Sequence, residues 1–176
     1  VTQWQVVATV QTISEAHLLP VIEQMLEQFP FEILGFHADN GSEYVNHRVA
    51  RMLDKLKVEF TRSRPRHSND NGLAETKNGA VVRKEFGYAH IPQRHAVRFN
   101  TYCREYLNPF LNFHRPCLFA TELADPKKPG RIKRVYRPRD AMTPLDKLAS
   151  LPDAASFLRP GGTLLELQKL ARALTD

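Results

Sequence analysis

The chain has 176 residues, 42% hydrophobic and 25% charged, which is long enough for one globular core with an appendage. Its 25 Lys and Arg against 19 Asp and Glu give a formal net charge of +6, which favours a polyanionic partner such as DNA or RNA, although a merely soluble basic protein can share this balance. Two cysteines exclude a disulfide framework, and neither a membrane-spanning apolar run nor a signal-peptide pattern is present, so we expect a soluble, cytoplasmic protein without membrane contact.

The first elements are predicted to be a strand, a helix and a second strand. Residues 4–10 alternate between apolar and polar side chains, as a strand does. Ser14 predicts the start of a helix, which Pro20 should kink or delay. One face of that helix carries Leu18, Val21, Ile22, Met25 and Leu26. The apolar run 31–38 then predicts a buried strand, and hence a parallel α/β unit.

Asp39 follows this second strand directly and is a candidate site residue. Ligands of open α/β sheets bind at the carboxyl ends of strands, where a carboxylate can reach them. The alternative is structural, because Asp39-Asn40-Gly41 is also a sequence that forms turns. The position therefore predicts a site without proving one.

An arginine-rich stretch follows the next helix and strand. Asn46 is a predicted helix cap, and residues 58–61 are predicted to form a short strand. The polar stretch after it carries Arg62, Arg64 and Arg66, a density that suits phosphate binding. A solvated run of charges is the alternative interpretation.

A second candidate acid, Glu75, lies on a predicted helix capped by Asn69 or Asp70. The helical spacing places Asn78 and Gly79 on the same face as Glu75. A glycine inside a helix costs ~1 kcal/mol relative to alanine, so we expect a ligand or a neighbouring element to approach Gly79 closely. The basic residues around that face are Lys77, Arg83 and Lys84.

The remainder of the chain is predicted to contain two helices separated by a basic connector. Residues 96–107 show an amphipathic helix that Pro109 should end. Thr163 and Glu166 form a capping box for a C-terminal helix with an apolar stripe. The connector is expected to be extended and to follow a phosphate backbone; its basic residues are Lys127, Lys128, Arg131, Lys133, Arg134, Arg137 and Arg139.

Two acidic motifs resemble the integrase-core transposases of bacterial insertion sequences, which are relatives of retroviral integrases. That family is marked by three acids, with about 35 residues between the last two. Residues 39–43 match the motif of the second acid, residues 69–78 look like the helix of the third, and 35 residues separate Asp39 from Glu75. Four shorter stretches also look like that group: residues 62–66, 82–84, 112–116 and 142–144.

The resemblance implies an α/β fold of the ribonuclease H-like type, a mixed sheet flanked by helices. Residues 1–120 would be the catalytic core without its first two strands, and 121–176 a basic connector with an amphipathic helix. The first acid of the family lies on an upstream strand, and no Asp or Glu occurs here before Glu15. We therefore expect this chain alone to be unable to assemble the full metal site.

The implied function is metal-dependent phosphodiester cleavage and strand transfer at the ends of a mobile element. Asp39 and Glu75 would be catalytic and would hold two Mg²⁺ (or Mn²⁺) ions, which prefer hard oxygen ligands. The partners would be element ends and target DNA, with at least a dimer in the working complex. The residues expected to contact DNA are Arg62, Arg64, Arg66, Lys77, Asn78, Arg83, Lys133, Arg134 and Arg137. The alternatives are a non-catalytic DNA-binding remnant and a ribonuclease H-like nuclease that only hydrolyses.

Overall fold

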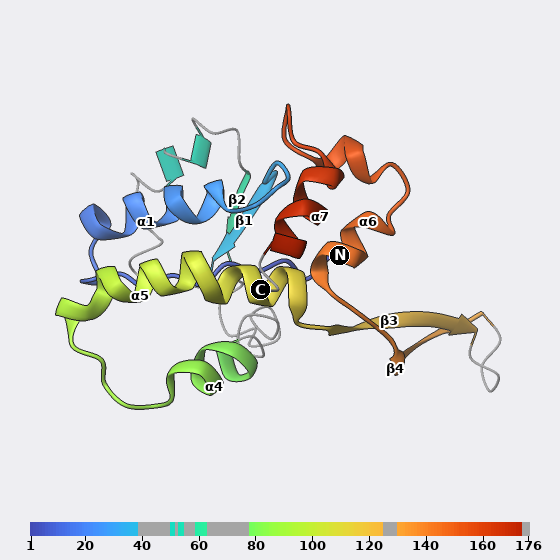
Figure 1. Cartoon of the computed structure of the whole chain (residues 1–176), viewed down its shortest axis with the longest axis horizontal. Helices are drawn as coiled ribbons and strands as arrows, with labels where there is room; N and C mark the ends of the chain where they lie inside the picture. Colours follow the sequence, from blue (N-terminus) through green and yellow to red (C-terminus); the bar gives the residue numbers. More distant parts are fainter. Residues whose placement is uncertain (39–49, 52, 55–58, 63–77, 125–129, 174–176) are drawn as a thin grey trace. The chain divides into compact units, whose positions relative to one another are not determined.

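A computed structural model describes residues 1–38, 50–51, 53–54, 59–62, 78–124 and 130–173 of this mixed α/β chain (Figure 1). The chain divides into two compact units. Unit 1 comprises Val1–Val6 and Glu105–Asp176, and unit 2 comprises Val7–Arg104. The division into 1–120 and 121–176, which follows the family resemblance, stays a prediction.

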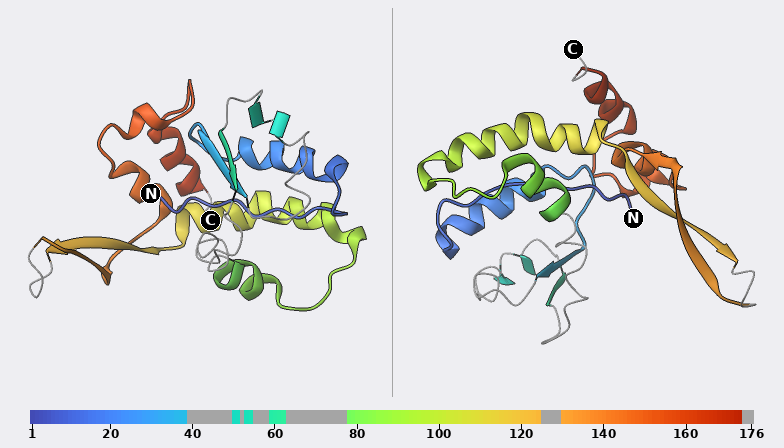
Figure 2. Two further views of the ribbon diagram at one scale, coloured as in Figure 1. Left: turned by 180° about the vertical axis from the view of Figure 1, so that it is seen from behind. Right: turned by 90° about the horizontal axis from the view of Figure 1, so that it is seen from below.

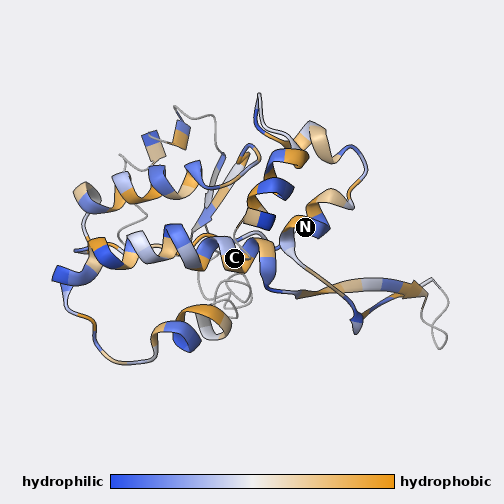
Figure 3. Cartoon of the chain, in the orientation of Figure 1, coloured by the Kyte–Doolittle hydropathy of each residue, from blue (hydrophilic) through white to orange (hydrophobic). Residues whose placement is uncertain are grey.

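Unit 2 is built on the helix α1, Glu15–Glu27, which begins directly after Ser14 as predicted. Pro20 lies inside this helix and does not delay its start, so that part of the expectation was wrong. The Ser14 carbonyl accepts a hydrogen bond from the Leu18 amide at 2.9 Å, so the first turn closes ahead of the proline. The core cluster of the unit joins Leu18 and Ile22 of α1 with Leu53, which is fully buried. Hydrophobic and hydrophilic residues alternate along α1 as in an amphipathic helix (Figure 3).

Two short strands of unit 2, β1 (Gly35–Ala38) and β2 (Glu59–Arg62), pair in parallel. Both were predicted, with bounds that differ by a few residues, and the parallel pairing is confirmed. The expectation that the first strand, β1, is buried was wrong, because Gly35 and His37 are exposed and Leu34, directly before the strand, is 74% exposed. Ile33 and Phe36 pack against the cluster beneath α1, which explains why the apolar run lies there. Residues 50–51 and 53–54 are helical, as predicted for the helix after Asn46, which itself lies outside the described residues. Other short helical segments of this unit are η3 (Asn78–Val82), α4 (Arg83–Phe86), η4 (Gln93–His95) and α5 (Ala96–Tyr102).

The predicted strand at residues 4–10 is not a strand in the structure. In unit 2 the side chain of Asn100 pairs with the backbone of Thr9: the Thr9 amide donates to Oδ1 at 2.8 Å and Nδ2 donates to the Thr9 carbonyl at 2.9 Å. In unit 1 Asn112 does the same to Gln5, at 2.9 and 2.7 Å. A primary amide offers one donor group and one acceptor side by side, as a neighbouring strand would. The alternating residues 4–10 therefore form an extended segment whose backbone is held by the side chains of Asn100 and Asn112 and not by a neighbouring strand.

Helical structure continues past Pro109, contrary to the prediction that this proline ends the helix. The π-helix η5 (Cys103–Leu107) is followed by two helical residues and a second π-helix, η6 (Phe110–His114). A π-helix bonds each carbonyl to the amide five residues later, so the carbonyl four residues before a proline needs no donor from it. The widened turns thus accommodate Pro109.

Unit 1 contains an antiparallel hairpin and three further helices. The strands β3 (Cys117–Ala124) and β4 (Ile132–Met142) pair with each other, and within the unit they extend past its helices as an arm (Figure 2). The helices are α6 (Pro144–Ala149), η7 (Ala154–Phe157) and α7 (Leu164–Ala173). Buried residues of this unit include Leu107, Leu111, Leu145, Leu148 and Leu158.

The basic stretch 127–139 was predicted to be an extended connector, and from Ile132 onward it is instead the strand β4. Lys127 and Lys128 lie outside the described residues. The predicted capping box is confirmed: the Glu166 amide donates to Thr163 Oγ1 at 3.2 Å, and the Thr163 amide donates to Glu166 Oε2 at 3.0 Å.

Candidate functional site

The shared end of β1 and β2 is the first part of the candidate site. Parallel strands present their carboxyl ends at one edge of a sheet, and the register pairs Ala38 with Arg62, the last residue of each strand. One step earlier, His37 Nδ1 and Thr61 Oγ1 are hydrogen bonded at 2.9 Å. Asp39 follows Ala38 in the sequence but lies outside the described residues. The strand end is thus confirmed, and the role of Asp39 stays a prediction.

The helical segment that follows Glu75 in the sequence is described from Asn78 onward and is packed into unit 2. Val81 in η3 is buried. The ring of Phe86, at the end of α4, lies 4.8 Å from that of Phe99, centroid to centroid. The hydroxyl of Tyr102 donates a hydrogen bond to Glu85 Oε1 at 2.5 Å. These contacts fasten residues 78–86 to α5, whereas Glu75 itself lies outside the described residues.

The contact with Glu85 changes the acidity of two neighbouring groups. The hydrogen bond to the Glu85 carboxylate raises the pKa of Tyr102, with burial adding to the effect, so the phenol stays a neutral donor. Burial, with the Glu85 charge as the smaller cause, raises the pKa of the Cys103 thiol to about 11. Because a nucleophilic or metal-binding cysteine must be a thiolate, Cys103 is a packing residue at neutral pH.

The predicted site residues fall into three sets. Outside the described residues are Asp39, Arg64, Arg66, Glu75 and Lys77. The backbones of Arg62 and Asn78 are described in unit 2, where Arg83 is also found, exposed and with its guanidinium carbon 5.7 Å from the centre of the Tyr88 ring. The third set is on β4 of unit 1: Lys133, Arg134 and Arg137.

Gly79 does not have the close neighbour that its position in a helix suggested. A Cβ built on Gly79 would meet no atom within 4 Å in the described part of the chain, the helix's own nearby backbone aside. Close approach of a neighbouring element therefore does not explain this glycine, and close approach of a ligand stays a prediction.

The hairpin places its basic residues in different electrostatic surroundings. Arg134 pairs with Glu122 across the strands, its Nε donating to Oε1 at 3.1 Å, and both side chains are more than half exposed. Within the described residues, Lys133 and Arg137 form no ion pair. From residue 117 to 124 and 130 to 142, five basic residues face two acidic ones, Glu122 and Asp140. The hairpin is therefore positively charged in spite of its one cross-strand pair.

A large, irregular β-bulge lies near the base of the hairpin. Leu118 pairs with Ala141 and Ala120 with Tyr136, so four residues of β4, 137–140, stand opposite Phe119 alone. Phe119 is buried, and the Lys147 ammonium of α6 lies 5.4 Å from the centre of its ring. Within the bulge, Asp140 Oδ2 accepts a hydrogen bond from Thr121 Oγ1 at 2.9 Å. The first contact attaches the base of the arm to α6, and the second joins β3 to the bulge of β4.

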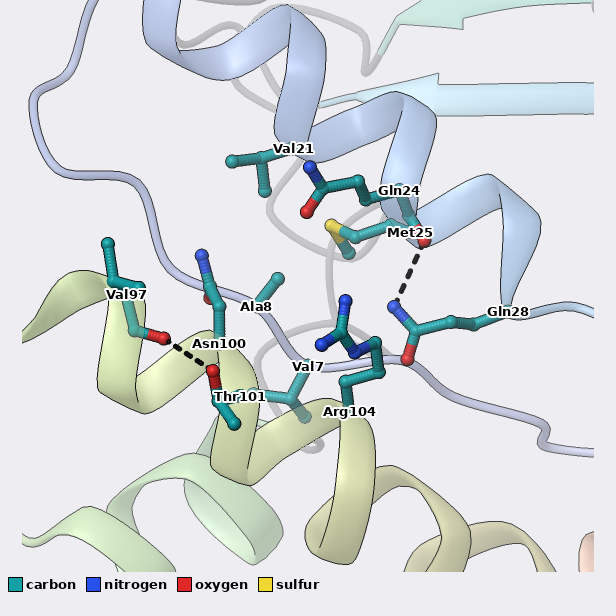
Figure 4. Close-up of a pocket in the computed structure, with 10 residues that line it drawn as sticks. All are labelled: Val7, Ala8, Val21, Gln24, Met25, Gln28, Val97, Asn100, Thr101 and Arg104. Atoms are coloured by element: carbon teal, nitrogen blue, oxygen red, sulfur yellow. Dashed lines mark hydrogen bonds between the residues drawn. The ribbon is translucent and has the colours of Figure 1, made fainter.

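A cavity of mixed polar and apolar lining in unit 2 was not predicted from the sequence. It has a volume of about 320 Å³ and is lined in part by Gln24, Gln28, Asn100, Thr101 and Arg104. The side chain of Arg104 extends toward α1 (Figure 4). The available signal was the four-residue spacing of Gln24 with Gln28 and of Asn100 with Arg104, which places polar residues on one side of each helix.

A second cavity in unit 2, of about 500 Å³, has a mainly apolar lining from residues 8–10, α1, β1 and the segment between α1 and β1. In the described part of the chain, no group of three or more His, Cys, Asp or Glu residues could hold a metal ion. Neither does any described helix have the length and apolar character that crossing a membrane requires.

Comparison with known proteins gives one distant similarity that carries no functional name. No protein-family model matches the chain. Over 90 residues, 51% of its length, the chain is 34% identical to a protein of Sinorhizobium fredii (strain NBRC 101917 / NGR234) named "Uncharacterized protein y4rM". The matched residues span 26% of that protein, about a quarter of its length.

Proposed function

We propose that the chain is part of the catalytic core of an integrase-type transposase, with a ribonuclease H-like fold, which cuts and joins DNA at the ends of a mobile element. The observation that carries the proposal is the parallel pair β1–β2, whose shared carboxyl edge immediately precedes Asp39. Ligands of open α/β sheets bind at the carboxyl ends of the strands, so an acid that directly follows β1 in the sequence is suited to a metal site there. The helical segment that follows Glu75 in the sequence packs against α5 through Phe86, and Glu75 would be the third acid that precedes this segment.

Asp39 and Glu75 would hold the metal ions, because carboxylate oxygens are the ligands that Mg²⁺ and Mn²⁺ prefer. Two such ions would activate the attacking oxygen and stabilise the leaving oxygen of a phosphodiester. Arg62, at the end of β2, would bind a DNA phosphate together with Arg64 and Arg66. The segment carrying Lys77, Asn78 and Arg83 would contact the DNA backbone near the reacting phosphate. Joining two ends requires at least two copies in the working complex.

Iron-mediated cleavage of the protein tests this metal site without requiring DNA cutting. Fe²⁺ occupies Mg²⁺ sites, and in the presence of ascorbate and hydrogen peroxide it reduces the peroxide to radicals that cut the polypeptide beside its ligands. We expect two cuts, one near Asp39 and one near Glu75, which excess Mg²⁺ suppresses. Asp39→Asn and Glu75→Gln should each abolish both cuts.

The matched control is Asp54→Asn, which removes an exposed helical carboxylate outside the proposed site and should leave both cuts in place. Cuts near Asp39 and Glu75 that persist in both site variants would contradict the proposal. That result would favour the alternative of a DNA-binding protein without catalysis.

Activity on DNA separates the remaining alternatives. With two acids of a three-acid site, the chain alone should show little nicking of duplex DNA in Mn²⁺, and robust nicking would overturn that expectation. If nicking occurs, joining of the cut end to a second duplex supports a transposase, and hydrolysis alone supports a nuclease.

A further inference from the structure

The hairpin of unit 1 has the dimensions of a known type of DNA-binding element. It is a two-stranded antiparallel ribbon whose paired part runs to Ala124 and Ile132. The major groove of B-form DNA, about 12 Å wide, admits a ribbon of two strands. The corresponding groove of double-stranded RNA is too narrow for side chains to enter. The shape therefore favours duplex DNA over duplex RNA.

The basic side chains of the ribbon can bind phosphate, but they differ in whether they already form an ion pair. Alternation along β4 puts Lys133 and Arg134 on opposite faces. Arg134 is paired with Glu122, whereas Lys133, and Arg137 at the start of the bulge, form no ion pair within the described residues. The latter two can therefore bind an anion without first giving up a partner.

The aromatic residues of the hairpin argue against a single-stranded ligand. Sites for single strands present successive exposed aromatic rings on which bases stack. In the described part of the hairpin, Phe119 is buried under Lys147, and Tyr136, 59% exposed, is the aromatic ring that a base could reach. One exposed ring does not make a stacking platform.

We propose that the β3–β4 hairpin is a duplex-DNA-binding arm, in which Lys133 and Arg137 contact phosphates while Glu122 restrains Arg134 in the free protein. The arm needs neither Asp39 nor Glu75 for this contact. It is attached at its base through Phe119 and α6, so the charged part of the ribbon can enter a groove while its base stays fixed. Release of Arg134 from an exposed ion pair costs little, because such pairs are weak.

Fluorescence anisotropy with a labelled duplex DNA of about 30 base pairs, in EDTA, tests the arm in the whole chain. The double variant Lys133→Gln/Arg137→Gln should weaken binding and reduce the slope of log K against log salt by about 2, one for each lost phosphate contact. Between 50 and 200 mM salt, that slope corresponds to about threefold in affinity for each contact. Glu122→Gln should instead strengthen binding, because it removes a negative charge and frees Arg134.

Lys169→Gln on α7 is the matched control, since it removes one exposed charge from the same unit outside the hairpin. It should leave the affinity near that of the unaltered chain, and thermal melts should confirm that every variant is folded. An unchanged salt slope in the double variant would overturn the proposal. So would equal dependence on these two residues for duplex RNA, single-stranded DNA or polyglutamate.

The two proposals can fail separately. Anisotropy in EDTA reports the hairpin when no metal is bound, and iron-mediated cleavage reports the acids when no DNA is present. Loss of the metal site would leave the DNA-binding arm untouched, and the reverse also holds.

Discussion

The two units hold the N-terminal segment by the same kind of contact, but the contacts differ in burial. In unit 1 Asn112 is 3% exposed and, besides clasping Gln5, donates to the Asn108 carbonyl at 2.8 Å. In unit 2 Asn100 is only partly buried, and the bonds described for it are those to Thr9. Because an unpaired polar group costs more where water cannot replace its partner, the same side chain should matter more in unit 1. The contribution of such an asparagine to stability therefore depends on how deeply it is buried as well as on the geometry of its hydrogen bonds.

The largest effect is expected for Asn112→Ala. The substitution removes three hydrogen bonds and leaves the backbone amide and carbonyl of Gln5 without partners, which should lower the free energy of unfolding by about 2–4 kcal/mol. Urea unfolding measures the loss, and hydrogen exchange of the Gln5 amide locates it. A loss smaller than that of Asn100→Ala would break the comparison.

Asn100→Ala should have the second largest effect. Two hydrogen bonds to Thr9 are lost at a partly exposed position, so we expect a loss of about 1–2 kcal/mol. The Thr9 amide should exchange faster while the Gln5 amide is unaffected. Faster exchange at both amides would mean that the segment is held as one piece.

Helix caps give a second comparison between the units. In unit 1 Thr143 caps α6 reciprocally with Asp146, accepting from its amide at 3.0 Å, and in unit 2 the Ser14 side chain makes no capping bond to α1. Thr143→Ala should therefore lower the unfolding free energy by about 1 kcal/mol, and Ser14→Ala should change it by less than about 0.5 kcal/mol. Thermal melts of the two variants side by side test this, and equal shifts would contradict it.

The smallest predicted effect is a loss of stability of unit 2 at alkaline pH, which is absent near neutrality. The folded-state pKa values of Tyr102 and Cys103 are raised, so the unfolded chain loses these protons first. The contribution of Cys103 to stability is complete below the ordinary thiol pKa of 9.0 and declines as pH rises toward about 11, and that of Tyr102 declines above the ordinary phenol pKa of 10.0. Urea unfolding at a series of pH values should show this decline, and Cys103→Ala should flatten it. An unchanged slope in that variant would assign the decline to other groups.

Local signals predicted the elements that depend on local interactions. Ser14 marks the start of α1, Leu18 and Ile22 lie in its core as expected, and Thr163 caps α7 with Glu166. The strand β1 was found because it ends a short apolar run, and β2 because Val58 and Phe60 alternate with Glu59 and Thr61. Such features are determined by neighbours within a few residues in the sequence, which a pattern can show.

Features that depend on distant partners were not predictable in the same way. The alternation at residues 4–10 was interpreted as a strand because nothing in it shows that Asn100 and Asn112 replace the neighbouring strand. The basic stretch became β4 because it pairs with β3, whose sequence gave no strand prediction. For the site, the end of β1 was predicted, while Asp39 and Glu75 stay predictions.

The bulge in β4 also bears on how the protein avoids associating with itself. A two-stranded ribbon has unpaired backbone groups along its outer edges, and flat edges of this kind can template the addition of another chain. Residues 137–140 interrupt the ladder, Pro138 has no amide hydrogen to donate, and Arg137 and Arg139 add like charges beside it. The base of the arm therefore offers a poor template for edge-to-edge aggregation, although the ribbon itself is open to solvent.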